Sequence, residues 1–286
     1  MFSPLEPVKF DAGQTDEIAL HMQEYGYVVI RDMIDQGQLQ SLFKQDLREV
    51  NRNLPENFSL WSLRAGVDYP NPRMPGLTGE WGLSQGRAAW AVRCNKGIQQ
   101  VFSNLLYTEN LVCSSDAIGF STDTEKISRQ SWLHVDQNPN IPTPLGAGVR
   151  SLQGIVYAED TQDPDGASTV LAPLSHRLWK LHDFKSRNHF QVVSQEEYGA
   201  QARRLMFKAG DLLIFDSKTV HQGWHGPHRL CFMVSYGRKE DRSELVRESK
   251  MLLYLTGYRS THWSQLAQHH GYKLCDIEGT LNHDLY

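Results

Sequence analysis

The sequence predicts a mainly β fold with flanking helices, an α+β class protein built around one sandwich or barrel. Short runs rich in β-branched and aromatic residues fill the middle of the chain, and turn residues separate them. Helical periodicity is confined to the regions on either side. Short strands separated by turn signals are typical of a sandwich or barrel. The predicted central strands are Leu111–Ser114, Val149–Ala158, Ser168–Leu171, Arg204–Phe207, Asp211–Phe215 and Leu230–Tyr236.

Helices are predicted on both sides of this region. The first, Glu17–Glu24, follows the capping residues Thr15 and Asp16 and ends at Gly26, and Tyr27–Ile30 then reads as a short strand. A second helix begins after Asp35, because apolar residues recur there at helical spacing. Its apolar positions are Leu39, Leu42, Phe43, Leu47 and Val50, and two further helices are predicted at Lys96–Leu106 and Ser243–Leu255.

Residues 56–92 are predicted to be irregular, because prolines alternate with glycines and tryptophans are interspersed among them. A loop of this length is typical of a functional lid or binding segment, although a surface meander fits the same pattern. We expect substrate specificity to arise in residues 59–93. The arginines there favour an anionic substrate or simply face solvent, and they are Arg64, Arg73, Arg87 and Arg93.

The composition predicts a single domain over residues 1–286, since 40% hydrophobic and 22% charged residues give an ordinary globular balance. We expect N-terminal helices and a lid-like loop over 1–110, a β core over 111–240, and a C-terminal helical extension over 241–286. A chain of this length builds its core without disulfides or a structural metal. Any metal site is therefore expected to be catalytic.

Charge and cysteine patterns restrict the class of partner. The net charge of -4 gives no reason to expect nucleic acid or an anionic membrane as a partner. The four cysteines form no CxxC pair, so reduced thiols are expected. Without a visible secretory signal or an apolar run of about 20 residues, a cytoplasmic protein is expected. The expected partner is a small molecule or a side chain, and the oligomeric state is left open.

A metal site is predicted at His134 and Asp136, which are two residues apart and so share one face of a strand. A third ligand is expected at His221, which follows the apolar run and polar turn that begin at Gly210. His225 and His228 are local rivals for this third position. Two imidazoles and one carboxylate leave three positions open on iron, so this set favours Fe(II) over zinc. A buried histidine bonded to an aspartate on a polar strand is the simpler alternative.

Arg229 precedes the apolar run Leu230–Val234 and would lie beside the predicted metal. A guanidinium group matches a carboxylate with two parallel hydrogen bonds. Arg229 is therefore predicted to hold the far carboxylate of a dicarboxylate co-substrate. Without the upstream histidine, a surface arginine paired with any acid would be the expected interpretation.

Several segments taken in order resemble the phytanoyl-CoA dioxygenase family of iron(II)/2-oxoglutarate oxygenases, and the resemblance extends from about Glu17 to about Trp263. Residues 26–30 resemble its early strand, and 134–137 its first metal motif. Residues 166–176 resemble its strand and Pro-Gly-Ser-His turn, with Leu174 replacing the glycine, and 210–221 the strand that delivers the second histidine. Arg229 lies where the family has its 2-oxoglutarate arginine, although the spacing from His221 is shorter than usual.

The resemblance implies a double-stranded β-helix, which is a jelly-roll or cupin-like barrel with iron in its mouth. It also implies conversion of 2-oxoglutarate and O2 to succinate and CO2, with hydroxylation or desaturation of an organic substrate. Because Asp136 is present, halogenation is disfavoured. Arg150 is a substitute for Arg229, Gln137 and Gln153 are weaker candidates for cofactor binding, and His176 is expected to be structural.

Two other classes of protein fit the same residues. One is a cupin-like metalloenzyme that does not use 2-oxoglutarate, and the other is a jelly-roll binding module that has lost catalysis. The intact set of three metal ligands argues against the binding module. Phosphoryl and acyl transfer are disfavoured, because the sequence contains neither a P-loop nor a GxSxG elbow.

Overall fold

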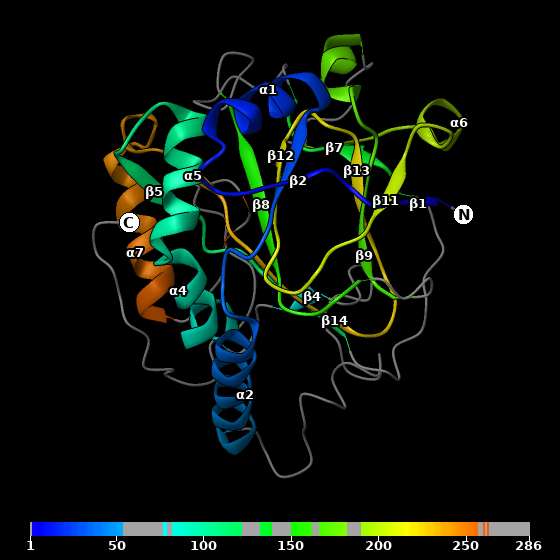
Figure 1. Ribbon diagram of the computed structural model, residues 1–286. Helices are drawn as coiled ribbons and strands as arrows, with labels where there is room; N and C mark the ends of the chain where they lie inside the picture. The colour runs from blue at the N-terminus through cyan, green and yellow to red at the C-terminus, as the bar shows by residue number, and fades with distance from the viewer. Residues whose placement is uncertain are drawn as a thin grey trace.

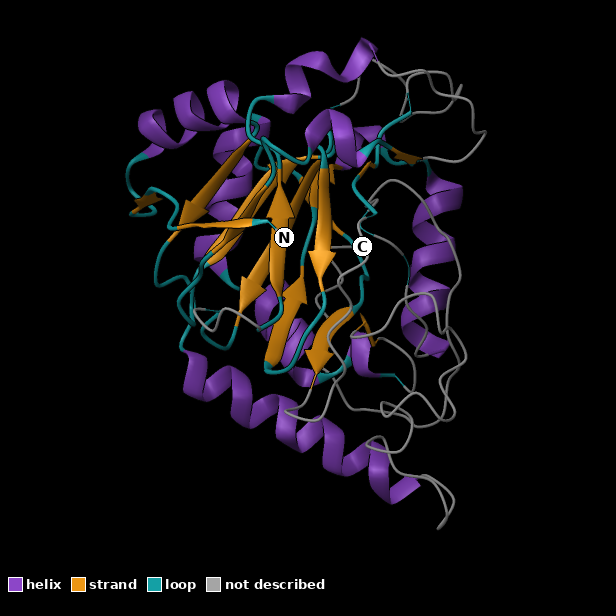
Figure 2. Cartoon of the chain, turned by 90° about the vertical axis from the view of Figure 1, so that its right-hand side faces the viewer, coloured by secondary structure: helices purple, strands orange, loops and turns teal. Residues whose placement is uncertain are grey.

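The computed structural model describes residues 2–53, 77–78, 82–121, 132–138, 150–161, 166–181, 190–256, 260 and 262. Two β-sheets that face each other form the centre of the structure, with helices on the outside (Figures 1 and 2). The predicted class, mainly β with flanking helices, is confirmed.

The first sheet has six strands. In spatial order they are β1 (Ser3–Leu5), β11 (Arg203–Leu205), β9 (Ser168–Leu171), β13 (His221–Trp224), β7 (His134–Val135) and β10 (Gln191–Val192). All of its neighbouring strands are antiparallel except β1 and β11, which run parallel. The sheet therefore places β7 beside β13, although the two strands are far apart in the sequence.

The second sheet has seven strands. Their order is β2 (Lys9–Phe10), β3 (Tyr27–Ile30), β12 (Leu212–Asp216), β8 (Leu152–Tyr157), β14 (Arg229–Met233), β6 (Ile118–Ser121) and β4 (Leu77–Thr78). A separate pair consists of β5 (Leu111–Cys113) and β15 (Tyr236–Arg238). Within the described ranges the two large sheets are separate, so they form a sandwich with open edges rather than a closed barrel.

The helices cover the outer face of the seven-stranded sheet (Figure 1). Phe43, Trp90 and Phe102 from three of the helices join Ile214 and Phe232 from the sheet in one large apolar core. Burial of this amphipathic surface is the main source of stability for such helices. The helices are α1 (Thr15–Tyr25), α2 (Gln36–Asn53), α4 (Arg87–Arg93), α5 (Lys96–Leu106), α6 (Gln195–Tyr198) and α7 (Glu244–Thr256), of which α6 lies by the other sheet.

A second apolar cluster fills part of the space between the sheets. Val29 and Leu213 from the seven-stranded sheet meet Leu171 and Leu205 from the six-stranded sheet there. The hydroxyls of Tyr157 and Thr169 join the two sheets through a 2.6 Å hydrogen bond. The rest of this interior is polar and contains the candidate site.

Three details differ from the sequence predictions. The predicted strand Leu230–Tyr236 is two strands, because the chain leaves β8 after Val234 and then pairs with β5 through Ser235 and Ser114. The predicted irregular stretch contains a 3-10 turn at Leu83–Gln85 and helix α4, while residues 54–76 and 79–81 lie outside the described residues. Strand β6 was not predicted.

Leu174 has a φ of 69°, in the left-handed region that favours glycine. The family pattern that residues 166–176 resemble has glycine at this position, and a leucine there strains the backbone. Among the described helices, none is both long and apolar enough to cross a membrane.

Candidate metal centre

The strand pairing brings the three predicted metal ligands together. His134 begins β7, Asp136 follows β7 directly, and His221 begins β13, where it pairs with His134. All three residues are buried, with exposed fractions of 6–7%. The sequence prediction that Asp136 lies on a strand with His134 is wrong by one residue, yet the bend after β7 still turns its carboxylate toward His134.

The distances fit a single metal ion. His134 Nε2 lies 3.4 Å from Asp136 Oδ1, and His221 Nε2 lies 3.1 Å from Asp136 Oδ2. Ligand atoms of the three side chains all lie within 4.8 Å of one another. Two ligands at right angles, each about 2.1 Å from a metal, are about 3 Å apart. The residues present therefore fit an ion bound by two imidazoles and one carboxylate, although metal binding itself stays a prediction.

Backbone carbonyls orient both imidazoles. His134 Nδ1 lies 3.1 Å from the carbonyl of Trp132, and His221 Nδ1 lies 2.9 Å from the carbonyl of Thr219. A carbonyl only accepts, so each Nδ1 carries the proton and each Nε2 has its lone pair toward the shared centre. This is the tautomer that metal-binding histidines need.

The electrostatics favour the charge states of metal ligands. Burial lowers the pKa of His134 to about 4, so its imidazole is neutral at neutral pH. Burial alone would raise the pKa of Asp136, but the imidazoles of His262, His134 and His221 lower it well below its usual range. Asp136 is therefore an anion that faces imidazole nitrogen atoms.

Gln153 supports Asp136 from the opposite sheet. Its Nε2 donates to Asp136 Oδ2 at 2.7 Å and contacts Ser217 Oγ at 3.2 Å. Ser217 Oγ in turn donates to Ser151 Oγ at 2.9 Å. The predicted role of Gln153 in cofactor binding is untested, whereas the contact in the structure is with a predicted metal ligand.

Arg229 lies in the interior between the sheets. It is 3% exposed, and its Nε and Nη1 atoms make no hydrogen bond with the described residues. Burial opposes its charge, but the nearby Cys231 and Tyr157 raise the pKa of Arg229, so it remains a cation. Nη1 lies 3.7 Å from the position that a Cβ on Gly223 would take. Because Gly223 follows His221 by two positions on β13, the guanidinium shares the inner face that carries the candidate ligand.

The rival residues lie elsewhere. His228 is exposed, and His225 stacks on Trp132, which itself stacks on His134 at a ring separation of 4.4 Å. Gln137 is fully buried and its predicted contact with a cofactor is untested. His176 Nε2 lies 3.1 Å from the carbonyl of Gln23, and the structural role expected for this residue stays a prediction.

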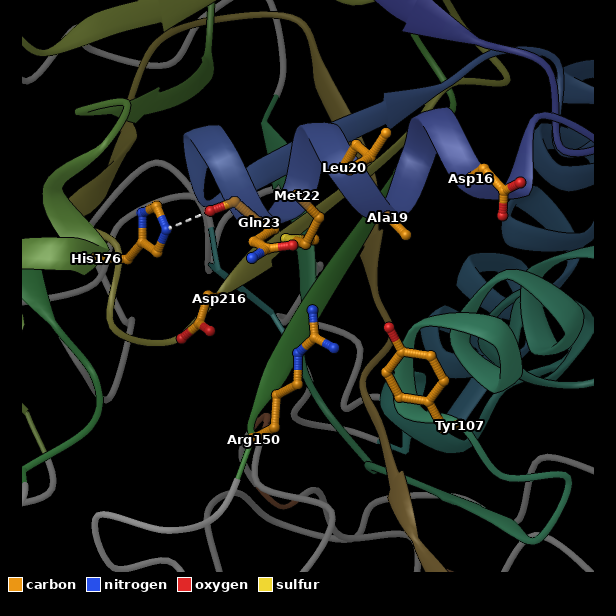
Figure 3. Close-up of a pocket in the computed structure, with 9 residues that line it drawn as sticks. All are labelled: Asp16, Ala19, Leu20, Met22, Gln23, Tyr107, Arg150, His176 and Asp216. Carbon is orange, nitrogen blue, oxygen red and sulfur yellow. Dashed lines mark hydrogen bonds between the residues drawn. The ribbon is translucent and has the colours of Figure 1, made fainter.

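Arg150 lines a different cavity, of about 670 Å³, between α1, Tyr107 and Asp216 (Figure 3). Its Nη1 donates to the carbonyl of Leu105 at 2.7 Å, and none of the three candidate metal ligands lines this cavity. Arg150 is therefore a weaker candidate than Arg229 for holding a co-substrate carboxylate beside the metal.

His262 was not predicted from the sequence. Its Nε2 lies 3.8 Å from Asp136 Oδ2, which makes it a third imidazole beside this carboxylate. No local spacing marks it, because it follows the last predicted helix in a segment without a motif. Only the fold brings it to the centre.

No protein-family model matches this chain. A curated relative, "Ava biosynthesis cluster protein O" of Aspergillus versicolor, is 24% identical over 159 residues, which are 49% of this chain and 50% of that protein. The chain thus matches about half the length of this relative.

The similar solved structures include two of one epimerase and one of a bacterial protein. The epimerase SnoN, in complex with Fe3+, alpha ketoglutarate and nogalamycin RO, has a TM-score of 0.56 and 13% identity, over 80% of this chain and 85% of SnoN. A second structure of SnoN, described as a non-heme alpha ketoglutarate dependent epimerase from nogalamycin biosynthesis, has a TM-score of 0.50. It is 14% identical over 80% of this chain and 82% of SnoN. A hypothetical protein, JW0805 from Escherichia coli, has a TM-score of 0.60 and 12% identity, over 98% and 84%.

At these identities the likeness concerns the fold. The chain shares the jelly-roll type of core with the epimerase SnoN, which confirms the predicted fold class. This core carries the candidate centre formed by His134, Asp136 and His221.

Proposed function

We propose that the protein is an Fe(II)/2-oxoglutarate-dependent dioxygenase that hydroxylates or desaturates a small organic molecule. One observation carries this proposal: two imidazoles and one carboxylate converge on the inner face that also carries a buried guanidinium, whose Nε and Nη1 atoms have no hydrogen-bond partner among the described residues. A metal with this ligand set retains open coordination positions. When bound, iron and 2-oxoglutarate supply the activation of O2 for oxidation of a C–H bond.

The residues of this chain would act as ligands and positioning groups. His134, Asp136 and His221 would hold the iron from one side, and Gln153 would fix the orientation of Asp136. Arg229 would bind the far carboxylate of 2-oxoglutarate, which would satisfy its Nε and Nη1 atoms. The missing side chain at Gly223 leaves space next to this guanidinium.

The similar proteins support the same class. SnoN is described with Fe3+ and alpha ketoglutarate, and the fungal relative belongs to a biosynthesis cluster, which favours a small-molecule substrate. The resemblance to the phytanoyl-CoA dioxygenase family rests on the segments around His134, Leu174 and His221 and agrees with this class. Because Asp136 occupies the position that halogenases leave open for halide, the proposal is oxidation without halogenation.

Succinate release from 2-oxoglutarate in the presence of Fe(II) tests the proposal, with uncoupled turnover included. We expect Arg229→Met to raise the KM for 2-oxoglutarate at least about tenfold, since hydrogen bonds to charged groups contribute about 1.5–3 kcal/mol. Arg150→Met, which removes the same charge from the other cavity, is expected to leave this KM unchanged. Turnover that needs iron but not 2-oxoglutarate would favour the cupin-like alternative, and a lack of Fe(II) binding would favour the binding module.

The outcome of the oxidation is a second question, because SnoN is described as an epimerase. The same ligand set would serve epimerisation if a hydrogen atom is removed from one face of the carbon and a reductant, such as a thiol, donates a hydrogen atom to the other face. Mass spectrometry of the product separates the outcomes. Hydroxylation adds one oxygen atom, desaturation removes two hydrogen atoms, and epimerisation leaves the mass unchanged.

A further inference from the structure

A second cluster of buried polar residues lies where α4, α7 and the β5–β15 pair meet. It contains Arg93 at the end of α4, Arg242 before α7 and Lys250 within α7, with exposed fractions of 1%, 9% and 0%. Cations are rarely buried to this extent without a partner. The cluster therefore calls for a physical explanation that the helix packing alone does not give.

Backbone carbonyl groups accept hydrogen bonds from two of these side chains. Arg93 donates to the backbone carbonyls of Ser84, at 2.6 Å, and Asp116, at 3.4 Å, and Arg242 donates to the carbonyl of Cys113 at 2.9 Å. Carbonyl groups accept hydrogen bonds but carry no net charge. Lys250 Nζ and Arg93 Nε are buried and have no hydrogen-bond partner among the described residues.

The surrounding charges point the same way. Burial lowers the pKa of Lys250 well below its ordinary value, and Arg242 and Arg93 lower it further, against the opposing effects of Cys113 and Asp116. Asp116 is thus the one carboxylate that acts on Lys250 in the described part of the chain, and it forms no ion pair with Lys250 there. A bound anion would stabilise the protonated form of this amine.

Three buried hydroxyl groups lie on the segments that form this cluster. The buried Oγ atoms of Ser84, Ser115 and Ser235 have no hydrogen-bond partner in the described residues. The chain connects them to the cluster, since the carbonyl of Ser84 holds Arg93 and Ser115 precedes Asp116. Buried donors without acceptors are costly. An oxyanion with several acceptor atoms would satisfy them, whereas a metal ion would be repelled and an apolar molecule would leave them unpaired.

Ser260 contacts a residue of the cluster, and His262 lies beside the candidate metal centre. The carbonyl of Ser115 accepts a 2.7 Å hydrogen bond from the amide of Ser260, and His262, two positions further along, lies 3.8 Å from Asp136 Oδ2. Two residues span at most about 7 Å. A molecule held at the cations would therefore lie near the place where oxidation is proposed.

We propose that Lys250 and Arg93, with the hydroxyls of Ser115 and Ser235, bind the oxyanion group of the organic substrate, a carboxylate or a phosphate. The assignment of this molecule as the substrate rests on the proposed function, whereas the anion site itself does not. The substrate class is then an organic anion, with its charged group remote from the bond that reacts.

Thermal unfolding of the metal-free, full-length protein tests the site, with inorganic phosphate and acetate compared against chloride at equal ionic strength. We expect phosphate or acetate to raise the Tm by about 3 °C at about ten times its dissociation constant. The anion that gives the larger shift identifies the group as phosphate or carboxylate. Equal Tm values in phosphate, acetate and chloride would overturn the proposal.

Lys250→Met identifies the residue. We expect this variant to lose the phosphate shift and, without any anion, to have a higher Tm than the wild type, because a buried amine that has no hydrogen-bond partner among the described residues is replaced by an apolar group. Lys239→Met removes the same charge from an exposed position and should retain the shift. A lower Tm of Lys250→Met together with a retained shift would mean that another group of the chain pairs with Lys250, and this would overturn the proposal.

Two milder variants keep the test valid if Lys250→Met does not fold. Ser115→Ala and Ser235→Ala each remove one hydroxyl donor, and each should weaken phosphate binding about tenfold. Unchanged affinity in both would overturn the proposal.

Arg229→Met should retain the anion shift, which separates this site from that of the co-substrate. If the anion shift fails while succinate release persists, the anion site is wrong and the proposed function stands.

Discussion

The two faces of the seven-stranded sheet bury different chemistry. On β8, Leu152 and Val156 point to the outer face and join the apolar core beneath the helices. Gln153 and Tyr157 alternate with them and point to the inner face, where Gln153 contacts Asp136 and Tyr157 contacts Thr169. The comparison shows that one strand supports stability on one side and the candidate chemistry on the other. Substitutions on the outer face should therefore lower the free energy of unfolding, and substitutions on the inner face should weaken iron binding.

The largest expected effect is on the inner side. Asp136→Asn removes the negative ligand and places amide hydrogens where a metal needs an oxygen lone pair. We expect this variant to lose tight Fe(II) binding, measured as iron content after anaerobic loading. His228→Gln, an exposed change in the same region, should load as the wild type does. Full iron content in Asp136→Asn would disprove the assignment of this ligand.

Substitutions on the outer face should change the stability of the protein instead of its iron binding. Phe232 is buried at 1% exposure and packs edge-on against Phe43. Phe232→Ala leaves a cavity, and we expect it to lower the free energy of unfolding by about 4 kcal/mol. Leu245→Ala, at a position that is 73% exposed, should change it by less than about 0.5 kcal/mol. The contrast between the faces fails if Phe232→Ala also weakens the iron affinity of the folded protein.

A smaller effect is expected where β8 supports the centre indirectly. Gln153→Leu retains the size of the side chain but removes the donor to Asp136. We expect Fe(II) affinity to fall about ten- to a hundredfold, as for other residues that orient a metal ligand. Gln40→Leu removes a similar amide donor, which bonds the carbonyl of Ala158 at the end of β8, and should leave the affinity unchanged. Equal affinities in the two variants would mean that Gln153 does not position Asp136.

The smallest effect should come from a turn that lies on neither face. Leu174→Gly relieves the left-handed backbone, and we expect it to raise the free energy of unfolding by about 0.5–1 kcal/mol. Leu174→Ala retains the strained backbone and should give no such gain, and urea denaturation measures both. A gain in the alanine variant would assign the cost to the exposed side chain rather than to the backbone.

Much of the fold could be predicted because its signals are local. The bounds of Tyr27–Ile30, Lys96–Leu106 and Ser168–Leu171 agree with the structure, since a cap, a periodic apolar face or a β-branched run marks each of them. Helix α4 was missed because its Pro- and Gly-rich surroundings outweighed the local helix propensity of residues 87–93. The switch between β14 and β15 depends on which strand is the neighbour, and a pattern along the chain does not contain that information.

The site shows the same limit. The spacing of His134 and Asp136 is visible in the sequence, and the strand and turn before His221 indicate the third ligand. Only the fold shows that His221 pairs with His134. His262 lacks such a pattern, and the burial of Arg93 and Lys250 is a tertiary property. Residues 59–76, where specificity was expected, lie outside the described residues, whereas Arg93 from the end of that stretch belongs to the cation cluster.

Strand β7 consists of only His134 and Val135, and it pairs with β13 at a single register position. Under the proposed function, the metal would bond one residue from each of these strands. It would therefore link the two strands where the sheet pairs them at only one position. A shortage of iron would then lower the stability of the protein as well as its activity. Proteases would encounter an opened edge, and the amount of enzyme would follow the supply of its metal.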